Sequence, residues 1–91
     1  MAFIITHDYI DTDAVGTIGP RSITETRVVR LRAGEGEEFR MLDDDNVLCY
    51  RGRILDARSD LQPLDCFGTP NVGCTQIQYR NSAGEFETIN G

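Results

Sequence analysis

The stretches that decide the fold are Glu37–Ile54, EEFRML-DDDN-VLCYRGRI, and Thr75–Ile89, TQIQYR-NSAG-EFETI. In each stretch, four residues that favour turns separate two runs in which apolar and polar residues alternate. Alternation with a period of two residues is typical of a strand that buries one face, and two such runs around a short turn predict a β-hairpin. The sequence therefore predicts a mostly β fold: a single small antiparallel sheet of about five or six strands built on two β-hairpins, with at most one short helix.

The first hairpin can be paired residue by residue across a four-residue loop, Asp43–Asn46. In that register Phe39 faces Tyr50, and Glu38 faces Arg51. Because side chains alternate between the two faces of a strand, the aromatic pair then lies inside and the ion pair outside.

The second hairpin is expected to place Tyr79 opposite Phe86 and Arg80 opposite Glu85. It repeats the arrangement of an aromatic pair inside and an ion pair outside. The two hairpins together predict a core of apolar residues: Phe39, Met41, Leu48, Tyr50, Ile77, Tyr79 and Phe86.

The first third of the chain contributes two further expected strands. Phe3–Thr6 reads as the first strand, and Asp8–Gly19 as a turn-rich segment that follows it. Ser22–Arg32, SITETRVVRLR, is rich in β-branched residues with a period near two, which favours a strand with a bulge near Val28. Ala33–Gly36 is then a turn before the first hairpin.

A connector of about twenty residues, Leu55–Cys74, joins the two hairpins. Asp60 is suited to cap a helical turn over Leu61–Phe67, with Gly68 as its end and Gly68–Gly73 as a compact loop. Connections this long tend to be functional or to carry structure of their own.

Length, composition and charge limit the classes of protein to which the chain can belong. The chain has 91 residues, 40% of them hydrophobic, and we expect a single domain over residues 1–91. No apolar run is long enough to cross a membrane, and the first residues lack the features of a signal peptide, so we expect a cytoplasmic protein. The net charge of −6 and pI near 4.5 argue against direct nucleic-acid binding and give no reason to expect a membrane partner.

The carboxylates fall in three clusters. One interpretation is solubility and turn chemistry; the other is an anionic surface for a basic partner. The run Asp43–Asn46 does not match a calcium loop, because Leu48 and Ile54 stand where a glycine and a glutamate are required. Asp and Asn are also favoured in hairpin turns. The clusters are Asp8, Asp11 and Asp13; Asp43, Asp44 and Asp45; and Asp56, Asp60 and Asp65.

The three cysteines and one histidine give weak signals for chemistry. The gap between Cys66 and Cys74 is wider than in usual zinc motifs, and the first-hairpin register places Cys49 on the outer face. Free thiols without a catalytic or metal-binding role are the favoured interpretation, and a pair of His7 with a cysteine is the catalytic alternative. We expect no metal, cofactor or catalytic residue.

A series of short motifs extends over most of the chain. They are Phe39–Asp45 (FRMLDDD), Tyr50-x-Gly52-Arg53, Pro63–Asn71 (PLDxFGTPN, with Cys66 at the variable position), Gly73–Arg80 (GCTxIQYR) and Glu85-x-Glu87-Thr88. Together they resemble the motifs of a group of small acidic bacterial and mobile-element proteins with no established activity. The resemblance implies no particular chemistry.

The leading hypothesis is therefore a non-enzymatic, acidic protein-interaction module, one that a mobile element could encode to inhibit a basic nucleic-acid-binding defence protein. The alternative is a small enzyme or ligand-binding domain centred on Leu64–Cys74. An unpaired edge strand also offers a route to a homodimer. The expected partner-binding residues are Asp43, Asp44, Asp45, Asp56, Asp60, Asp65, Thr69 and Asn71.

Overall fold

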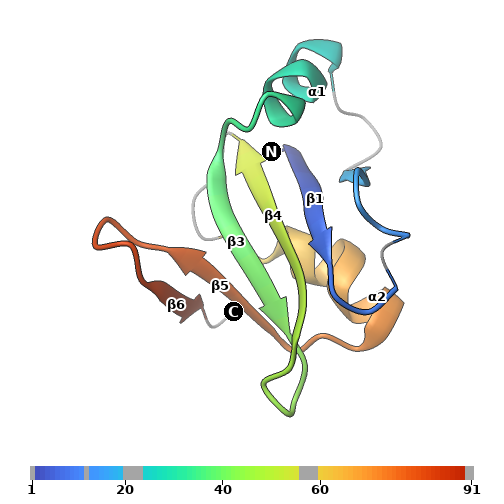
Figure 1. Ribbon diagram of the computed structural model, residues 1–91, viewed down its shortest axis with the longest axis vertical. Helices are drawn as coiled ribbons and strands as arrows, with labels where there is room; N and C mark the ends of the chain where they lie inside the picture. Colours follow the sequence, from blue (N-terminus) through green and yellow to red (C-terminus); the bar gives the residue numbers. More distant parts are fainter. Residues whose placement is uncertain (1, 12, 20–23, 56–59, 90–91) are drawn as a thin grey trace.

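The computed structural model of the chain describes residues 2–11, 13–19, 24–55 and 60–89. Their six strands form one antiparallel sheet with the order β2-β1-β4-β3-β5-β6 (Figure 1). This confirms the prediction of a single, mostly β antiparallel sheet. The elements in chain order are β1 (Ala2–Asp8), β2 (Ile18–Gly19), α1 (Glu25–Arg32), β3 (Glu37–Leu42), β4 (Leu48–Leu55), η1 (Leu64–Gly68), α2 (Thr69–Val72), β5 (Gln76–Arg80) and β6 (Phe86–Ile89).

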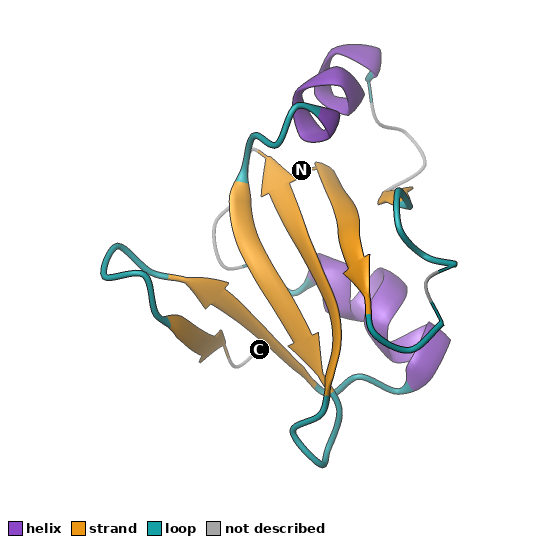
Figure 2. Ribbon diagram, in the orientation of Figure 1, coloured by secondary structure: helices purple, strands orange, loops and turns teal. Residues whose placement is uncertain are grey.

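The two faces of the sheet differ in what covers them. The helical segment η1–α2 packs on one face, which we call the core face (Figure 2). In the part of the chain that the structure describes, the opposite face, which we call the open face, is covered only by α1 and only at one end, where Leu31 packs against Ala2, Ile4 and Leu55. The core face carries the main cluster of buried side chains: Phe3, Ile5, Phe39, Met41, Cys49, Tyr50, Ile54, Leu64, Cys74, Ile77 and Tyr79.

The β3–β4 hairpin pairs in a register two positions away from the predicted one. Met41, rather than Phe39, lies opposite Tyr50. A shift by two residues preserves the faces, so Phe39, Met41 and Tyr50 are buried as predicted. An irregularity next to Met41 makes Cys49 an extra residue of β4.

That irregularity corrects two predictions from the sequence. Cys49 is 1% exposed, so its predicted position on the outer face is wrong. Leu48 is only half-buried, although it was expected in the core. Both corrections have one cause: the extra residue turns two consecutive side chains of β4, Cys49 and Tyr50, toward the interior.

The β5–β6 hairpin is shifted by one position, which has a larger effect. Arg80, rather than Tyr79, lies opposite Phe86. A shift by one residue moves the side chains of β6 to the other face, so Phe86 lies on the open face and is half-buried. The prediction that Phe86 belongs to the core is wrong, whereas Ile77 and Tyr79 are buried as predicted.

The segment Ser22–Arg32, predicted as a strand with a bulge near Val28, contains the helix α1 over Glu25–Arg32 instead. With α1 and the η1–α2 segment, the described residues hold two helical segments, so the prediction of at most one short helix is wrong. Two caps explain the helix. The Thr24 hydroxyl accepts a hydrogen bond from the Arg27 N–H at the start. At the end, Gly34 takes a positive φ of 86°, and the Glu35 N–H donates to the Arg30 carbonyl oxygen at 3.1 Å. These capping bonds outweigh the β propensity of the branched residues. Residues 22 and 23 lie outside the described part of the chain.

The connector is helical beyond the predicted turn. Asp60 Oδ1 accepts a hydrogen bond from the Gln62 N–H at 2.8 Å, the capping role expected of it. The helical segment then continues through η1 and α2 to Gly73, whose φ of 71° ends it. The predictions of an end at Gly68 and a loop over Gly68–Gly73 are therefore wrong. Gly68 is buried where the helical segment lies close to the sheet. A Cβ at this position would lie 2.7 Å from Met41 Sδ, so the close approach requires a glycine.

The π-helical geometry of η1 follows from a proline. Pro70 has no N–H to donate to the carbonyl oxygen of Cys66, and its ring would clash with that oxygen in a regular α-helix. The Thr69 N–H instead bonds the carbonyl oxygen of Leu64, five residues back. The wider turn continues the helical path past Pro70 and directs Phe67, Asn71 and Val72 toward the end of β1.

Candidate functional site

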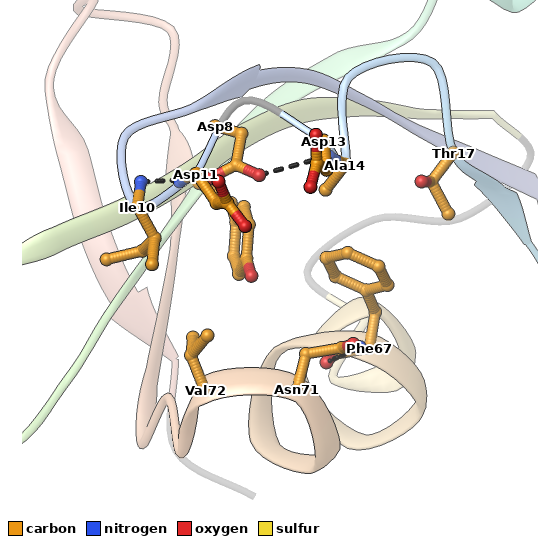
Figure 3. A pocket seen from close by; sticks show the side chains of 10 residues that line it. Asp8, Ile10, Asp11, Asp13, Ala14, Thr17, Phe67, Asn71 and Val72 are labelled. Atoms are coloured by element: carbon orange, nitrogen blue, oxygen red, sulfur yellow. Dashed lines mark hydrogen bonds between the residues drawn. The ribbon is translucent and has the colours of Figure 1, made fainter.

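A pocket of about 370 Å³ lies between the loop that follows β1 and the η1–α2 segment. Asp8, Asp11 and Asp13 line one side, and Phe67, Asn71 and Val72 line the other (Figure 3). The rest of the lining is Ile10, Ala14, Thr17 and Tyr50. The pocket therefore combines one of the predicted acidic clusters with part of the predicted functional connector.

Asp8 organises the loop that forms the acidic side. Its Oδ1 accepts hydrogen bonds from the N–H groups of Ile10 and Asp11 at 2.8 and 3.0 Å, and its Oδ2 accepts one from the Ala14 N–H at 3.0 Å. The side chain is 9% exposed. A buried carboxylate is stabilised by such donors, so Asp8 acts as the structural centre of this loop.

Asp11 and Asp13 are exposed at the rim of the pocket. The negative charge of Asp13 and a hydrogen bond between the two side chains raise the pKa of Asp11 above its usual value. Two carboxylates that repel each other favour a cationic neighbour. Within the described residues, however, no group of three or more His, Cys, Asp or Glu side chains is arranged to hold a metal ion.

Tyr50 lies on the inner side of the pocket. Burial, and then the charge of Asp8, raise the pKa of the Tyr50 hydroxyl. Its ring meets Phe67 edge to face, with 5.0 Å between the ring centroids. This aromatic contact ties the helical wall to the sheet and leaves the pocket with a mixed polar and apolar lining.

The carboxylates of the acidic hairpin loop after β3 have two different roles. Asp43 Oδ1 accepts hydrogen bonds from the N–H groups of Asp45 and Val47, at 2.9 and 3.0 Å. Asn46 takes a positive φ of 61°, as the last residue of a three-residue loop often does. Asp43 is therefore part of the turn, as the turn-chemistry interpretation predicted, whereas Asp44 and Asp45 are exposed.

This loop and the loop after β1 lie at the same end of the sheet (Figure 1). The Tyr9 N–H donates to the Cys49 carbonyl oxygen at 2.9 Å, which joins the end of β1 to the start of β4. Tyr9, Ile10 and Val47 are about half exposed here, among the carboxylates. We call the described residues of the two loops together, 9–11, 13–17 and 43–47, the acidic loop end.

The predicted connector residues have mixed roles. Thr69 donates its hydroxyl hydrogen to the Cys74 carbonyl oxygen at 2.8 Å, and Asp60 caps the helical segment, so both are used within the fold. Asn71 lines the pocket and donates to the Phe67 carbonyl oxygen at 2.7 Å. Asp65 is exposed on η1. Asp56 lies outside the described residues.

The thiols do not assemble with the histidine. Cys49 and Cys74 are buried next to each other, and burial followed by the Cys49 contact raises the pKa of Cys74 to about 12. Cys66 is exposed and donates to Gln62 Oε1 at 3.2 Å. His7 is exposed, and its ring stacks on Tyr9. Because a nucleophilic thiol needs a lowered pKa, the environment of Cys74 disfavours catalysis there.

Sequence reasoning missed a cluster of arginines on the open face. The Glu38 carboxylate lies at its centre: Oε1 is 3.0 Å from Arg51 Nη2 and 3.9 Å from Arg53 Nη2, and Oε2 is 2.9 Å from Arg80 Nη1. Beside it, Arg40 Nε donates to Gln78 Oε1 at 2.6 Å. Arg51 and Arg53, two positions apart on one strand, were the available signal that arginines share a face.

Burial alone would raise the pKa of Glu38. The hydrogen bond from Arg80 and the charges of Arg51, Arg80 and Arg53 outweigh burial and hold the pKa below its usual value. Glu38 is therefore the anionic centre of this cluster.

Comparison of the chain with protein-family models, curated proteins and solved structures gives no match. Among the helices in the described ranges, none has the length and apolar character needed to cross a bilayer.

Proposed function

We propose that this chain is a non-enzymatic protein-interaction module that binds a basic partner through its acidic loop end. The observation that carries the proposal is the mixture of half-exposed apolar side chains, Tyr9, Ile10 and Val47, with the exposed carboxylates of two loops at one end of the sheet. Apolar anchors supply binding energy in an interface, while surrounding charges steer the approach of the partner.

The partner class is a protein with an Arg- or Lys-rich surface. A nucleic-acid-binding groove is a surface of that kind, and an anionic protein surface can occupy it in place of phosphates. An inhibitor of such a protein, of the kind that a mobile element uses against host defence, is the specific role that we propose. It rests on the net charge of −6, the small size and the resemblance described above.

The experiment is an affinity pull-down from a lysate at low and high salt, followed by association kinetics with the captured protein. Replacing Asp44 and Asp45 with Asn removes two exposed charges and keeps the side chains suited to a turn. We expect this variant to associate more slowly and with a flatter salt dependence. Asp65→Asn is the matched control, because Asp65 is exposed outside the acidic loop end. Association that is insensitive to salt and to the Asn substitutions contradicts the proposal.

A second candidate function is binding of a small ligand in the pocket. The observation in its favour is the convergence of Asn71, Thr17 and the Asp11–Asp13 pair on a cavity with an aromatic wall. A screen of small cationic compounds by thermal shift tests it. A ligand whose stabilising effect is lost in Asn71→Ala and Asp13→Asn, with the unliganded stability unchanged, supports a ligand-binding role.

A further inference from the structure

The arginines of the open face form a surface with the opposite charge to the rest of the molecule. Three of them, Arg51, Arg53 and Arg80, surround the carboxylate of Glu38, and a fourth, Arg40, lies opposite Arg51 on the neighbouring strand. The cluster thus has a formal excess of three positive charges, on a chain whose net charge is −6. We call these five residues the arginine face. Among the described residues, helix α1 is the only element that packs on this side of the sheet, at its far end.

Two of the arginines are direct cross-strand neighbours. Arg40 on β3 lies opposite Arg51 on β4. Like charges in this relation are destabilising, because their Cβ atoms are only about 5 Å apart. Glu38 bonds Arg51. No comparable ion pair engages Arg40 within the described part of the chain, so the position between the two side chains favours an additional anion.

Arg40 is held in place for such an anion. Its Nε donates to Gln78, and its guanidinium lies over the Phe86 ring, with 4.2 Å between Cζ and the ring centroid. In the described residues, no hydrogen bond engages its two Nη groups. A guanidinium fixed on one side, with its outer donors free, is prepared for a two-point contact with a carboxylate or phosphate.

The chemistry around Arg40 favours carboxylates over nucleic acid. A stacking platform for bases needs an open aromatic face, whereas Arg40 already covers the Phe86 ring. A carboxylate needs no such platform, because a guanidinium binds it by paired hydrogen bonds alone.

The chain itself presents a segment of this kind. The β3–β4 loop projects beyond the sheet (Figure 1), and Asp44 and Asp45 at its tip are exposed and adjacent. Asp43, by contrast, is engaged in the turn. We propose that the arginine face receives the Asp44–Asp45 tip of a second copy of this chain, with the tip carboxylates next to Arg40 and Arg51.

The contact joins two different surfaces, so it is heterologous: it extends into an open chain of copies unless the rotation between successive copies closes a ring. Self-association and the binding of a basic partner both use the Asp44–Asp45 tip, but only self-association uses the arginine face. A basic partner that binds the tip therefore competes with self-association, which makes self-association a means of regulating the tip.

The test measures molar mass by light scattering at high protein concentration. At about 20 mM salt we expect a mass above the 10.2 kDa of one chain, and at about 500 mM, where the Debye length falls to roughly 4 Å, a return to one chain. Arg40→Gln with Arg51→Gln should remain monomeric at low salt, as should Asp44→Asn with Asp45→Asn. Arg32→Gln and Asp65→Asn, which change charge elsewhere, should associate like the unaltered chain.

Mixing the two double variants gives the sharpest result. One supplies an intact tip and the other an intact arginine face, so an equimolar mixture should form a heterodimer of twice the monomer mass that does not grow further. A monomeric unaltered chain at low salt, or association that survives Arg40→Gln with Arg51→Gln, overturns the proposal. Binding of a single-stranded oligonucleotide by a monomeric chain, lost in the Arg40/Arg51 variant, would also overturn it and assign the face to phosphates.

The same variants separate this inference from the proposed function. The Arg40/Arg51 variant should bind an Arg-rich peptide as well as the unaltered chain does, because its tip is intact. Loss of peptide binding in that variant contradicts the assignment of separate roles to the tip and the face.

Discussion

Individual residues with the same chemistry perform the same task at both hairpin turns. Asp43 Oδ1 accepts hydrogen bonds from the N–H groups two and four residues later, and Asn81 Oδ1 does the same for Ala83 and Glu85. Each loop then ends in a residue with positive φ, Asn46 or Gly84. An apparently functional acidic run therefore contains one aspartate with a structural role and two exposed ones.

This difference predicts unequal effects within the run. Asp43→Ala removes two hydrogen bonds to the backbone and should lower the free energy of unfolding by about 1–2 kcal/mol. Asp44→Ala and Asp45→Ala remove exposed side chains and should change it by less than about 0.5 kcal/mol. Urea denaturation of the three variants measures the difference. Equal effects at all three positions would show that Asp43 does not hold the turn.

The cysteines should differ in reactivity for a similar reason. Cys66 is exposed, whereas Cys49 and Cys74 are buried and the pKa of Cys74 is raised to about 12. Because the thiolate is the reactive form, an aromatic disulfide reagent should label one thiol rapidly in the native chain and all three in denaturant. Cys66→Ser should abolish the rapid phase. Rapid labelling of a second thiol in that variant would contradict the burial of the Cys49–Cys74 pair.

Among the elements, the two hairpins could be predicted because their turn residues and the alternation of apolar and polar residues point to the same structure. Their registers could not, because the expected four-residue loops are three-residue loops in the structure, with Asp43–Val47 and Asn81–Glu85 as closing pairs. The strand expected over residues 22–32 failed for a different reason. β-branched residues dominated that prediction, whereas Thr24 and Gly34, visible in the sequence as helix caps, decide the structure.

The corrected register of β6 gives a test by mutation. Tyr79 is 3% exposed on the core face, and its hydroxyl donates to the Asp60 carbonyl oxygen at 2.7 Å. Tyr79→Ala should therefore cost about 3–5 kcal/mol of stability. Phe86→Ala, on the open face, should cost clearly less. A larger loss from Phe86→Ala than from Tyr79→Ala would restore the register in which Phe86 belongs to the core.

At the scale of the whole molecule, charge is divided between two regions. The acidic loop end could be anticipated from the clusters Asp8–Asp13 and Asp43–Asp45, because turn residues fall at strand ends. The arginine face could not, because it depends on the order of the strands and on a register that brings Arg80 and Phe86 together. The pocket could not be anticipated either, since it needs the helical path through Pro70.

Glu38 links this charge pattern to the dependence of stability on pH. Its pKa is lower in the folded chain than the usual glutamate value of 4.5, so its ionised form stabilises the fold above that pH. This contribution is lost as the pH falls below 4.5 and through the lowered pKa. Glu38→Gln should lower the free energy of unfolding at neutral pH. In acid, the difference in this free energy between the variant and the unaltered chain should become smaller, as measured by urea denaturation across the pH range. A difference that is constant with pH would contradict the role of Glu38.

The acidic loop end, which we propose as the binding surface for a basic partner, can be examined residue by residue in solution. The most direct measurement is a titration of the isotope-labelled chain with an Arg-rich peptide, followed by amide NMR shifts. We expect shifts concentrated in residues 9–17 and 43–47, and smaller shifts in the Asp44→Asn, Asp45→Asn variant and with added salt. Shifts concentrated on β3, β4 and β5 at the arginine face would show that the acidic loop end is not the binding surface. So would shifts that change with neither the substitutions nor the salt.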